Sequence, residues 1–476
     1  MYTQLAETDV RLLKRMLPSL GYIGGTWADC LEVSVDTDFA GVRIRNLDTN
    51  PNFVNFRMVL PTKDGKVVSL EPSRISVAQS SSRKNTNLLP HTMQQTSPGV
   101  HTGKEYQPWW QATSDGLLNA NGLKFFNRRD KWGVRARSIS IEILLTGGEW
   151  VEVYNSGSLD YRRKVMSELH RISGELFPEW IPTTQATADK WHDDTVHALR
   201  ERLDEDPECM TRNGWLSAAS LIPTSTACPL SGDEWRVLAH GLYRQVRRDR
   251  NSKSGIASFG GVLRTRAALE RLSSEISHVS VKQGDARHAV ARHGVVPSGT
   301  LRENADGYIS TIRALISSLH RLGSQGMLAY GTLLGAVRES DFISHDDDVD
   351  LFYTVRPEPG ESFEDAALRV EQGLRGFGWN VSGISGYMNS HVSYHQRSEV
   401  LDIFPLDIST ANVPVHMAQM NVELLPRDWF VDPVSVELRG TSLPAPARFH
   451  KFLLARYGES WSESDPYHDW VWRLDA

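Results

Sequence analysis

The stretch YGTLLGAVRESDFISHDDDVDLFY, Tyr330 to Tyr353, decides how the C-terminal region of this chain folds. A Gly-Thr pair opens a short predicted helix, a loop follows, and the chain returns as a predicted strand with alternating carboxylates. Successive side chains of a strand point to opposite faces. The pattern therefore predicts that Asp346, Asp348 and Asp350 share one face, while the apolar residues between and after them pack on the other.

Several carboxylates on one face predict a cation site. They repel one another and are costly to bury unless a cation neutralises them. Oxygen ligands suit Mg²⁺ or Mn²⁺, and substrate phosphates commonly complete the coordination shell. Gly331 and Thr332, at the start of the helix, can present backbone N–H groups to a phosphate. We therefore expect metal-assisted phosphoryl or nucleotidyl transfer. An acidic surface loop is the simpler alternative, but here the DDD triplet runs directly into the apolar strand VDLFY.

Three motifs in this region resemble a known family. GTLLGAVR, FISHDDDVDLFY and VLDIFPLD look like the signature of the LicD family, nucleotidyltransferase-fold enzymes related to fukutin. The resemblance spans roughly Gly294 to Tyr467. It implies transfer of a phospho-alcohol, such as phosphocholine or ribitol phosphate, from a CDP-linked donor to a glycan hydroxyl. It also implies the residues of the site, which are Gly331 and Thr332 in the turn, Asp348 and Asp350 in the Asp-x-Asp motif, and Asp402 as the third carboxylate.

Asp348 and Asp350 are the expected metal ligands. Asp402 is expected to be either a third ligand or the general base for the attacking hydroxyl, with a structural hydrogen-bond acceptor as the alternative. Arg338 can clamp a phosphate or form an ion pair with the acidic loop. Asp407 is a weaker third carboxylate and is expected to cap a helix. Three further residues between the acidic motifs could contact donor or acceptor: His391, His395 and Arg397.

Composition bounds the class of protein. The chain has 476 residues, of which 40% are hydrophobic and 23% charged, so we expect a soluble protein of two or three domains. A net charge of −6 gives no sign of nucleic-acid binding. The three cysteines lie far apart without CxxC spacing, which favours reduced thiols and a cytoplasmic location. No apolar run approaches the ~20 residues of a membrane span, and no signal peptide is expected. Peripheral membrane association stays open.

The N-terminal region is expected to be all-β. Residues 1–25 form a lead-in with a helix up to about Leu20, and residues 26–157 alternate with period two, as in LEVSVDTD, GVRIRNL and NFRMVLPTKDGKVVSL. The KDGK turn predicts a hairpin. Many short strands without helices between them favour a β-sandwich or jelly roll.

Part of this region resembles a second family. WWQ, GLKFFNRRDKWGVRARSISIEI and GGEWVEVYNSG look like a discoidin-type, galactose-binding-like domain over about Asn85 to Gly157. Such folds often bind glycans through loops at one end of the sandwich. Core packing is nevertheless the favoured role of the tryptophans Trp109, Trp110 and Trp150. A structural ion-pair and turn cluster is the favoured role of Asn127, Arg128, Arg129 and Asp130, and the same network could extend to Arg135 and Arg137.

Residues 158–293 are predicted to be helical, with four helices and Ser-, Thr-, Gly- and Pro-rich loops between them. RQVRRDR is interpreted as a solvated helix end, with a surface for a phosphate-rich glycan or a lipid headgroup as the alternative. The His/Asp group around His192 and His197, with Asp193 and Asp194, is interpreted as surface polar residues rather than a metal site.

Residues 294–476 are predicted to form an α+β nucleotidyltransferase-like domain. It should open with a helix over Ala305 to Leu322 and contain strands at MLAY, DDDVDLFY, GWNVSGIS, HVSYH and EVLDIFPLDI. A helix in FEDAALRVEQGLRGF should pack inward through Leu368, Leu374 and Phe377.

Two other functions remain open at this point. One keeps the fold and places a nucleoside monophosphate on a sugar, small molecule or protein, which would release pyrophosphate. The other is a glycan-binding scaffold with an inactive transferase domain. The carboxylates Asp348, Asp350 and Asp402 argue against the inactive scaffold.

Overall fold

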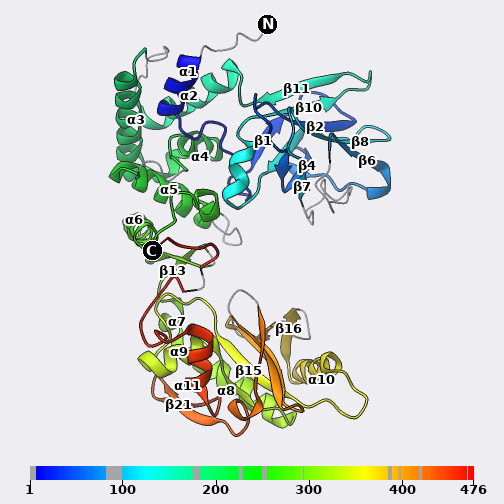
Figure 1. Ribbon diagram of the computed structural model, residues 1–476, viewed down its shortest axis with the longest axis vertical. Helices are drawn as coiled ribbons and strands as arrows, with labels where there is room; N and C mark the ends of the chain where they lie inside the picture. The colour runs from blue at the N-terminus through cyan, green and yellow to red at the C-terminus, as the bar shows by residue number, and fades with distance from the viewer. Residues whose placement is uncertain are drawn as a thin grey trace. The chain divides into compact units, whose positions relative to one another are not determined.

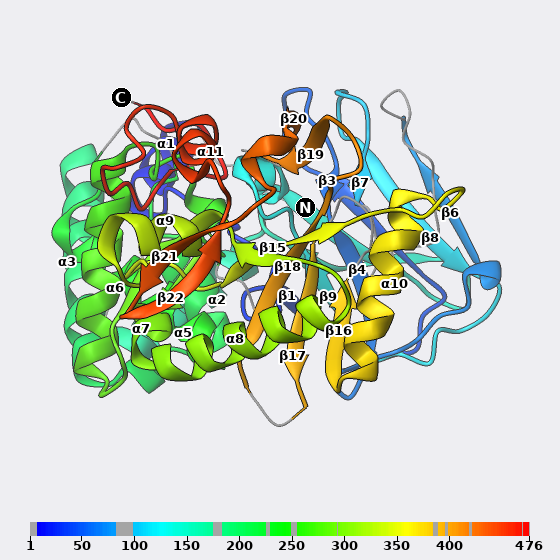
Figure 2. The same ribbon diagram turned by 90° about the horizontal axis from the view of Figure 1, so that it is seen from below.

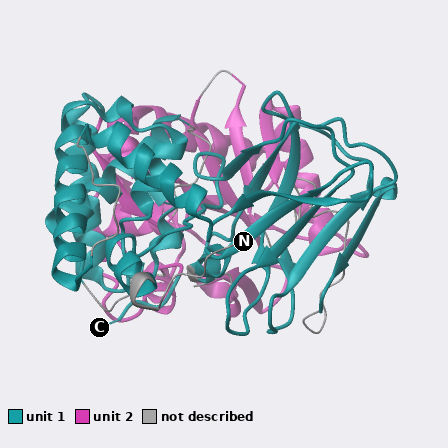
Figure 3. Cartoon of the chain, turned by 90° about the horizontal axis from the view of Figure 1, so that it is seen from above, with its two compact units in different colours: residues 1–285, 293–295, 472–476 teal, residues 286–292, 296–471 magenta. Residues whose placement is uncertain are grey.

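The chain divides into two compact units, which Figure 3 colours separately. The first unit comprises Met1–Asp285, His293–Val295 and Trp472–Ala476, and the second comprises Ala286–Arg292 and Val296–Val471. The computed structural model describes residues 7–81, 99–174, 183–224, 229–248, 255–292, 294–383, 389–395, 398–417, 421–468 and 470–475. The β-rich and helical regions, which the sequence predicted as two domains, both lie in the first unit. No described helix is long and apolar enough to cross a membrane.

Two antiparallel sheets make up the β-rich region (Figure 1). The described four-stranded sheet has the order β1 (Leu31–Ser34), β9 (Gly122–Phe126), β4 (Met58–Lys63), β5 (Lys66–Val67). The described five-stranded sheet has the order β11 (Trp150–Asn155), β10 (Ile139–Leu144), β2 (Gly41–Asn46), β8 (Trp109–Ser114), β6 (Ile75–Gln79). Two further short strands, β3 (Asn55–Phe56) and β7 (Val100–His101), pair with each other in antiparallel orientation. The predicted KDGK hairpin is present: Lys63 faces Lys66, and Asp64 and Gly65 both have positive φ.

Both sheets contribute to one hydrophobic core. Val33, Phe125 and Val59 of the four-stranded sheet belong to the same buried cluster as Ile44 and Ile141 of the five-stranded sheet. β1 alternates between buried and exposed residues, as a strand with one buried face should. β4 is buried on both faces: Val59 lies in this core, and Met58 and Leu60 belong to a second buried cluster with Phe126. The structure thus confirms a β-rich N-terminal region. The resemblance to discoidin-type domains stays a prediction.

The tryptophans and the NRRD run are mostly structural. Trp110 is buried in the core, whereas Trp150 is partly exposed with the Arg43 guanidinium 3.9 Å from its ring centroid. The buried Asn127 amide donates to the carbonyls of Ile23 and Gly133, each at 2.9 Å. Arg128 and Asp130 form an ion pair, and Asp130 caps a 3-10 helix. Arg137 is not part of this network: its guanidinium donates to Thr224.

The rest of the first unit is helical. It begins with α1 (Glu7–Met16) and continues with α2 (Leu159–Ser173), α3 (Gln185–Glu205), α4 (Arg212–Ala219), α5 (Gly232–Arg248) and α6 (Arg266–Lys282). The sequence predicted all of these except α4. That helix is buried along most of its length, so it has no polar stripe, and the Thr211 side chain caps it through the Gly214 N–H at 3.0 Å. A Cβ on Gly241 of α5 would lie 1.9 Å from the Trp215 ring, so this mid-helix glycine lets α4 approach α5.

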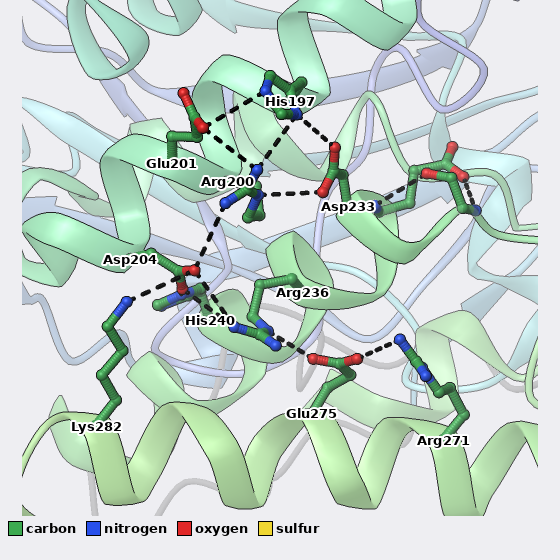
Figure 4. Close-up of polar contacts among 12 residues, drawn as sticks. His197, Arg200, Glu201, Asp204, Asp233, Arg236, His240, Arg271, Glu275 and Lys282 are labelled. Atoms are coloured by element: carbon green, nitrogen blue, oxygen red, sulfur yellow. Dashed lines mark hydrogen bonds and ion pairs between the residues drawn. The ribbon is translucent and has the colours of Figure 1, made fainter.

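A polar network joins α3, α5 and α6 (Figure 4). Asp204 of α3 lies 2.9 Å from His240 Nε2, 3.3 Å from Arg236 and 3.6 Å from Lys282. Glu275 of α6 pairs with Arg236 at 2.5 Å and with Arg271 at 2.6 Å. Asp204, His240, Arg236 and Glu275 are largely withdrawn from water and depend on one another for charge compensation, whereas Lys282 and Arg271 are about half exposed.

The histidines of α3 also join helices. His192 lies 2.9 Å from the Met16 carbonyl through Nδ1 and 3.0 Å from Glu234 through Nε2. His197 pairs with Asp233 at 2.9 Å. Neither histidine belongs to a group that could hold a metal in the described part of the chain.

The second unit is built on a five-stranded sheet within its described residues. Its order is β14 (Gly326–Leu328), β15 (Asp350–Val355), β18 (Val400–Asp407), β17 (Ser390–Tyr394), β16 (Trp379–Gly383). β15 and β18 run parallel and lie side by side in Figure 2, whereas the other described neighbours in the sheet are antiparallel. The remaining elements are the short strands β12 (His288–Ala291), β13 (Gly294–Pro297), β19 (Asn412–His416), β20 (Val422–Pro426), β21 (Val434–Leu438) and β22 (Thr441–Ala445), and the helices α7 (Thr300–Glu303), α8 (Ala305–Arg321), α9 (Tyr330–Glu339), α10 (Phe363–Gly376) and α11 (Phe449–Tyr457).

Helices cover both faces of this sheet. α8 and α10 pack on it side by side (Figure 2). Leu374 of α10 is buried as predicted, but Leu368 is 36% exposed, because the buried stripe runs through Ala367 and Val370 instead. Phe352 of β15 contacts Tyr330 of α9 and Phe452 of α11, with ring centroids 5.0 and 5.4 Å away. Asp350 shares the strand face of Phe352, so it lies on the α9 and α11 side.

Candidate active site

Three aspartates converge where the two parallel strands begin. Asp350 opens β15 and is the register partner of Asp402 on β18. Carboxylate oxygens of Asp348, Asp350 and Asp402 all lie within 4.8 Å of one another. The same criterion groups Asp348 with Asp346 and Asp347. The strand starts only at Asp350, so Asp346 and Asp348 lie on the segment before it and not on the strand face that the sequence predicted.

These carboxylates are in an unfavourable environment without a cation. Asp350 is 7% exposed. Burial raises the pKa of Asp350, and the charges of Asp348, Asp346 and Asp402 raise it further, against a backbone hydrogen bond from Gly331. Burial and the neighbouring Asp348 raise the pKa of Asp346 in the same way. The fold therefore holds negative charge at a cost that a bound cation would offset.

The Gly-Thr pair at the start of α9 supports the carboxylates. A Cβ on Gly331 would lie 2.2 Å from Asp346 Oδ2, so only glycine leaves room for that carboxylate. The buried Thr332 hydroxyl accepts a hydrogen bond from the Asp350 backbone N–H at 2.9 Å. Tyr330, the first residue of the helix, has φ +38° and packs its ring 4.8 Å from that of Phe404. The predicted contact of Gly331 and Thr332 with a substrate phosphate stays a prediction.

Asp402 bonds two side chains, one from the neighbouring strand β17 and one from the residue just before that strand. His391 Nδ1 lies 2.5 Å from Asp402 Oδ1, and the Asn389 amide donates to Oδ2 at 2.8 Å. β17 and β18 are antiparallel with His391 directly opposite Asp402, which explains the contact. His391 was expected to contact donor or acceptor, and Asn389 was not indicated, because the register between two strands cannot be read from either motif. His395 follows β17, and Arg397 lies outside the described residues.

Arg338 pairs with its neighbour Glu339 at 2.6 Å and donates to the Glu463 carbonyl at 3.3 Å. Its predicted contact with a substrate phosphate stays a prediction, whereas the predicted role of Asp407 is wrong. Asp407 does not cap a helix. Its carboxylate accepts hydrogen bonds from the backbone N–H and the hydroxyl of Ser409, at 2.9 and 2.6 Å, in the turn after β18.

Two tyrosines that the sequence did not indicate lie close enough to these carboxylates for the negative charges to raise their pKa. Burial raises the pKa of Tyr457, and the charges of Asp350, Asp346 and Asp348 add to the effect while Arg456 opposes it. Burial likewise raises the pKa of Tyr308, together with the charges of Glu399, Asp347 and Asp348. Both phenols therefore stay protonated at neutral pH and are available as hydrogen-bond donors.

The donor set fits a hard divalent cation. The two groups of described residues that could hold a metal consist of aspartates alone, with no thiolate or imidazole among them. Carboxylate oxygens suit Mg²⁺ and Mn²⁺ rather than softer metals. Asp348, Asp350 and Asp402 form the group that joins the two central strands.

Comparison with known proteins supports a transferase function for this region. Residues 323–448 match the family model described as LicD/FKTN/FKRP, nucleotidyltransferase domain. The match contains Gly331, Asp348, Asp350 and Asp402. No curated protein matches the chain. The second unit of this protein thus contains a domain similar to the nucleotidyltransferase domain of the LicD, FKTN and FKRP proteins.

Proposed function

We propose that this protein is a metal-dependent phosphotransferase. In this proposal it moves a phospho-alcohol, phosphocholine- or ribitol-phosphate-like, from a CDP-linked donor to a hydroxyl of a surface polysaccharide or related glycan. The observation that carries the proposal is the convergence of Asp348, Asp350 and Asp402 within a domain similar to the LicD family. The donor and acceptor classes follow from that similarity. The free thiols of Cys30 and Cys209 support a cytoplasmic location as part of the proposal.

Asp348, Asp350 and Asp402 would hold the Mg²⁺ or Mn²⁺ ion. Such an ion, when bound, supplies positive charge that neutralises the donor phosphates and the departing nucleotide. The protein's own contribution is positioning. Thr332 fixes the first residue of β15, and Gly331 leaves the space that the Asp346 carboxylate occupies.

In this proposal Asp402 is either a metal ligand or the general base for the acceptor hydroxyl. Its side chain is 16% exposed, and His391 and Asn389 each bond one of its oxygens. These two partners fix the orientation of the carboxylate, which a general base or a ligand both require. If Asp402 is the base, Asp402→Asn should keep donor affinity and lose transfer. If it is a ligand, donor and metal affinity should fall with the rate.

A donor screen tests the proposal. The full-length protein is incubated with CDP-choline or CDP-ribitol and Mg²⁺, with and without glycan acceptors, and the released nucleotide is identified. We expect CMP, released only with metal and not by Asp350→Asn. Asp407→Asn is the matched control, because Asp407 bonds its own turn at the other end of β18. Metal-independent release, or equal release by Asp350→Asn, would contradict the proposal.

A second function uses the same carboxylates. The matched domain is described as a nucleotidyltransferase domain, so transfer of a nucleoside monophosphate to a sugar, small molecule or protein is the alternative. That reaction releases pyrophosphate from a nucleoside triphosphate, whereas the proposed reaction releases a nucleoside monophosphate. The two products separate the alternatives directly.

A further inference from the structure

A basic cavity lies in the first unit, far in sequence from the carboxylates. It has a volume of about 510 Å³ and is formed by the segment before β1, the beginning of α4 and the C-terminal half of α5. Its polar and aromatic lining consists of Trp27, Glu32, Thr211, Arg212, Asn213, Arg244 and Arg248. Three of these seven side chains are guanidinium groups, and one is a carboxylate.

Among the residues that the structure describes, the acidic partners do not balance this charge. Arg212 forms an ion pair with Glu32, but Glu32 is also paired with Lys124 at 3.0 Å. Arg248 pairs with Glu208 at 3.0 Å, and Glu208 is shared with Arg247 at 3.2 Å. Each acid thus serves two cations, so the cavity wall keeps an excess of positive charge that attracts anions.

Arg244 is the buried member of this wall. It is 9% exposed, and its Nε donates to the Met210 carbonyl at 2.6 Å. Its Nη1 is buried and has no hydrogen-bond partner among the described residues. Burial lowers the pKa of Arg244 to about 10, and the charges of Arg248 and Arg212 contribute. A buried guanidinium N–H without an acceptor is costly, so this arginine is not fully satisfied by its described neighbours.

Two further features of the cavity wall suit a ligand in which a phosphate group is attached to a sugar ring. Residues 211–213 place the N-terminal end of α4 at the cavity, where the helix dipole favours negative charge. Trp27 supplies an aromatic surface, and its ring is held by an edge contact with Phe126 at 4.7 Å. Guanidinium groups bind phosphate oxygens in pairs, and an indole face packs against a flat apolar surface such as that of a sugar ring.

We propose that this cavity binds a phosphate-bearing sugar, with the phosphate at Arg244, Arg212 and Arg248 and the sugar ring against Trp27. The site is independent of the carboxylate cluster and of the transfer reaction. It would let the first unit recognise a phosphorylated glycan through a single sugar phosphate.

Calorimetric titration of the full-length protein tests this site. The titration is done in EDTA, so that no metal bridges phosphate to the carboxylates. The probes are glucose 1-phosphate, inorganic phosphate, glucose and CMP. We expect glucose 1-phosphate to bind more tightly than phosphate or CMP, and glucose not to bind.

Two arginine variants distinguish the cavity from general surface charge. Arg248→Gln should weaken glucose 1-phosphate binding about tenfold, the size expected for one charge-assisted hydrogen bond. Arg247→Gln is the matched control: it removes the same charge one residue away and also loses a pair with Glu208, but Arg247 does not line the cavity. Trp27→Ala should bring glucose 1-phosphate affinity down to that of phosphate. Circular dichroism verifies that each variant is folded.

Three results would overturn the proposal. They are no binding of glucose 1-phosphate at millimolar concentration, equal weakening by Arg247→Gln and Arg248→Gln, and binding of CMP that is tighter than that of glucose 1-phosphate and is weakened by Arg248→Gln. The last would assign the cavity to a nucleotide instead of a sugar phosphate.

Discussion

The charge of Asp350 has two opposite effects: it destabilises the metal-free protein, and it would favour the binding of a cation. Its carboxylate is buried beside Asp348, Asp346 and Asp402, and its pKa is raised by burial and by those charges. At neutral pH the ionised form therefore destabilises the metal-free protein. The same charges would become favourable once a divalent cation lies among them.

Replacing Asp350 should consequently separate stability from metal binding. We expect Asp350→Asn to stabilise the metal-free protein by about 1 kcal/mol, because it removes one repelling charge and keeps an oxygen for the Gly331 N–H. Mn²⁺ at about 100 times its dissociation constant should stabilise the wild type by about 2.7 kcal/mol and the variant far less. Thermal unfolding with and without Mn²⁺ measures both. If Asp350→Asn is less stable than the wild type in the absence of metal, repulsion between the carboxylates does not dominate the stability of the metal-free protein.

Gly331 provides a second prediction at this scale. A Cβ there would lie 2.2 Å from Asp346 Oδ2, so Gly331→Ala must displace that carboxylate. We expect a loss of about 1–3 kcal/mol of stability and weaker Mn²⁺ binding. Gly376→Ala in α10 is the control, because a Cβ at Gly376 meets no atom within 4 Å. Equal effects of the two substitutions would mean that helix propensity, not the carboxylate contact, explains Gly331.

Individual residues were only partly predictable. The alternation of aspartates and the spacing to the Gly-Thr pair indicated Asp348 and Asp350, because local sequence determines both. His391 and Asn389 were not assigned to Asp402, because their contact depends on the register between β17 and β18. Arg338 and Asp407 have local partners, Glu339 and Ser409, that compete with the longer-range roles expected of them.

At the scale of elements, the polar network around Asp204 holds the helices of the first unit. The pKa of Asp204 lies well below its usual value, because the hydrogen bond from His240 and the charges of His240, Arg236 and Lys282 outweigh the effect of burial. A lowered pKa means that this interaction stabilises the protein at pH values above about 3.8 and is lost as the pH falls further.

We therefore predict that Asp204→Asn lowers the free energy of unfolding by about 2–3 kcal/mol at pH 7, since Arg236 and Lys282 lose their shared partner. The difference from wild type should shrink as the pH falls below about 4. Urea unfolding at pH 7 and at pH 2 measures it, because the stabilisation is lost only as the pH approaches the lowered pKa of Asp204. Asp194→Asn, which removes an exposed pair with Lys190 on the same helix, should change stability by less than about 0.5 kcal/mol. A pH-independent difference would contradict the assignment.

The predictability of elements followed their amphipathicity. α3, α6 and α8 have one buried face, and the sequence located each of them. α5 was located as well, although Val237 to Gln245 are all buried, because it spans 17 residues where α4 spans 8. α4 escaped detection because it is buried on most sides and contains a glycine, so neither a polar stripe nor helix propensity marks it. The strand of the DDD motif was extended too far toward its N-terminus, because alternation alone does not show where backbone pairing begins.

At the scale of the whole molecule, the two compact units should unfold separately. Each has its own hydrophobic core: the two antiparallel sheets of the first unit share one buried cluster, and the mixed sheet of the second unit lies in another. We predict that residues 286–471 expressed alone are folded and keep Mn²⁺ affinity, and that calorimetry of the full chain shows two transitions. Only one of the two should shift with Mn²⁺. An unfolded fragment by circular dichroism would show that the second unit needs the first.

The central claim is that Asp348, Asp350 and Asp402 together hold one divalent cation. Titration of Mn²⁺ followed by electron paramagnetic resonance tests it most directly, because it counts free and bound ions without any substrate. We predict one tight site in the full-length protein, weakened at least tenfold in Asp348→Asn and Asp350→Asn and unchanged in Asp407→Asn. Wild-type affinity in both Asp348→Asn and Asp350→Asn would contradict the claim.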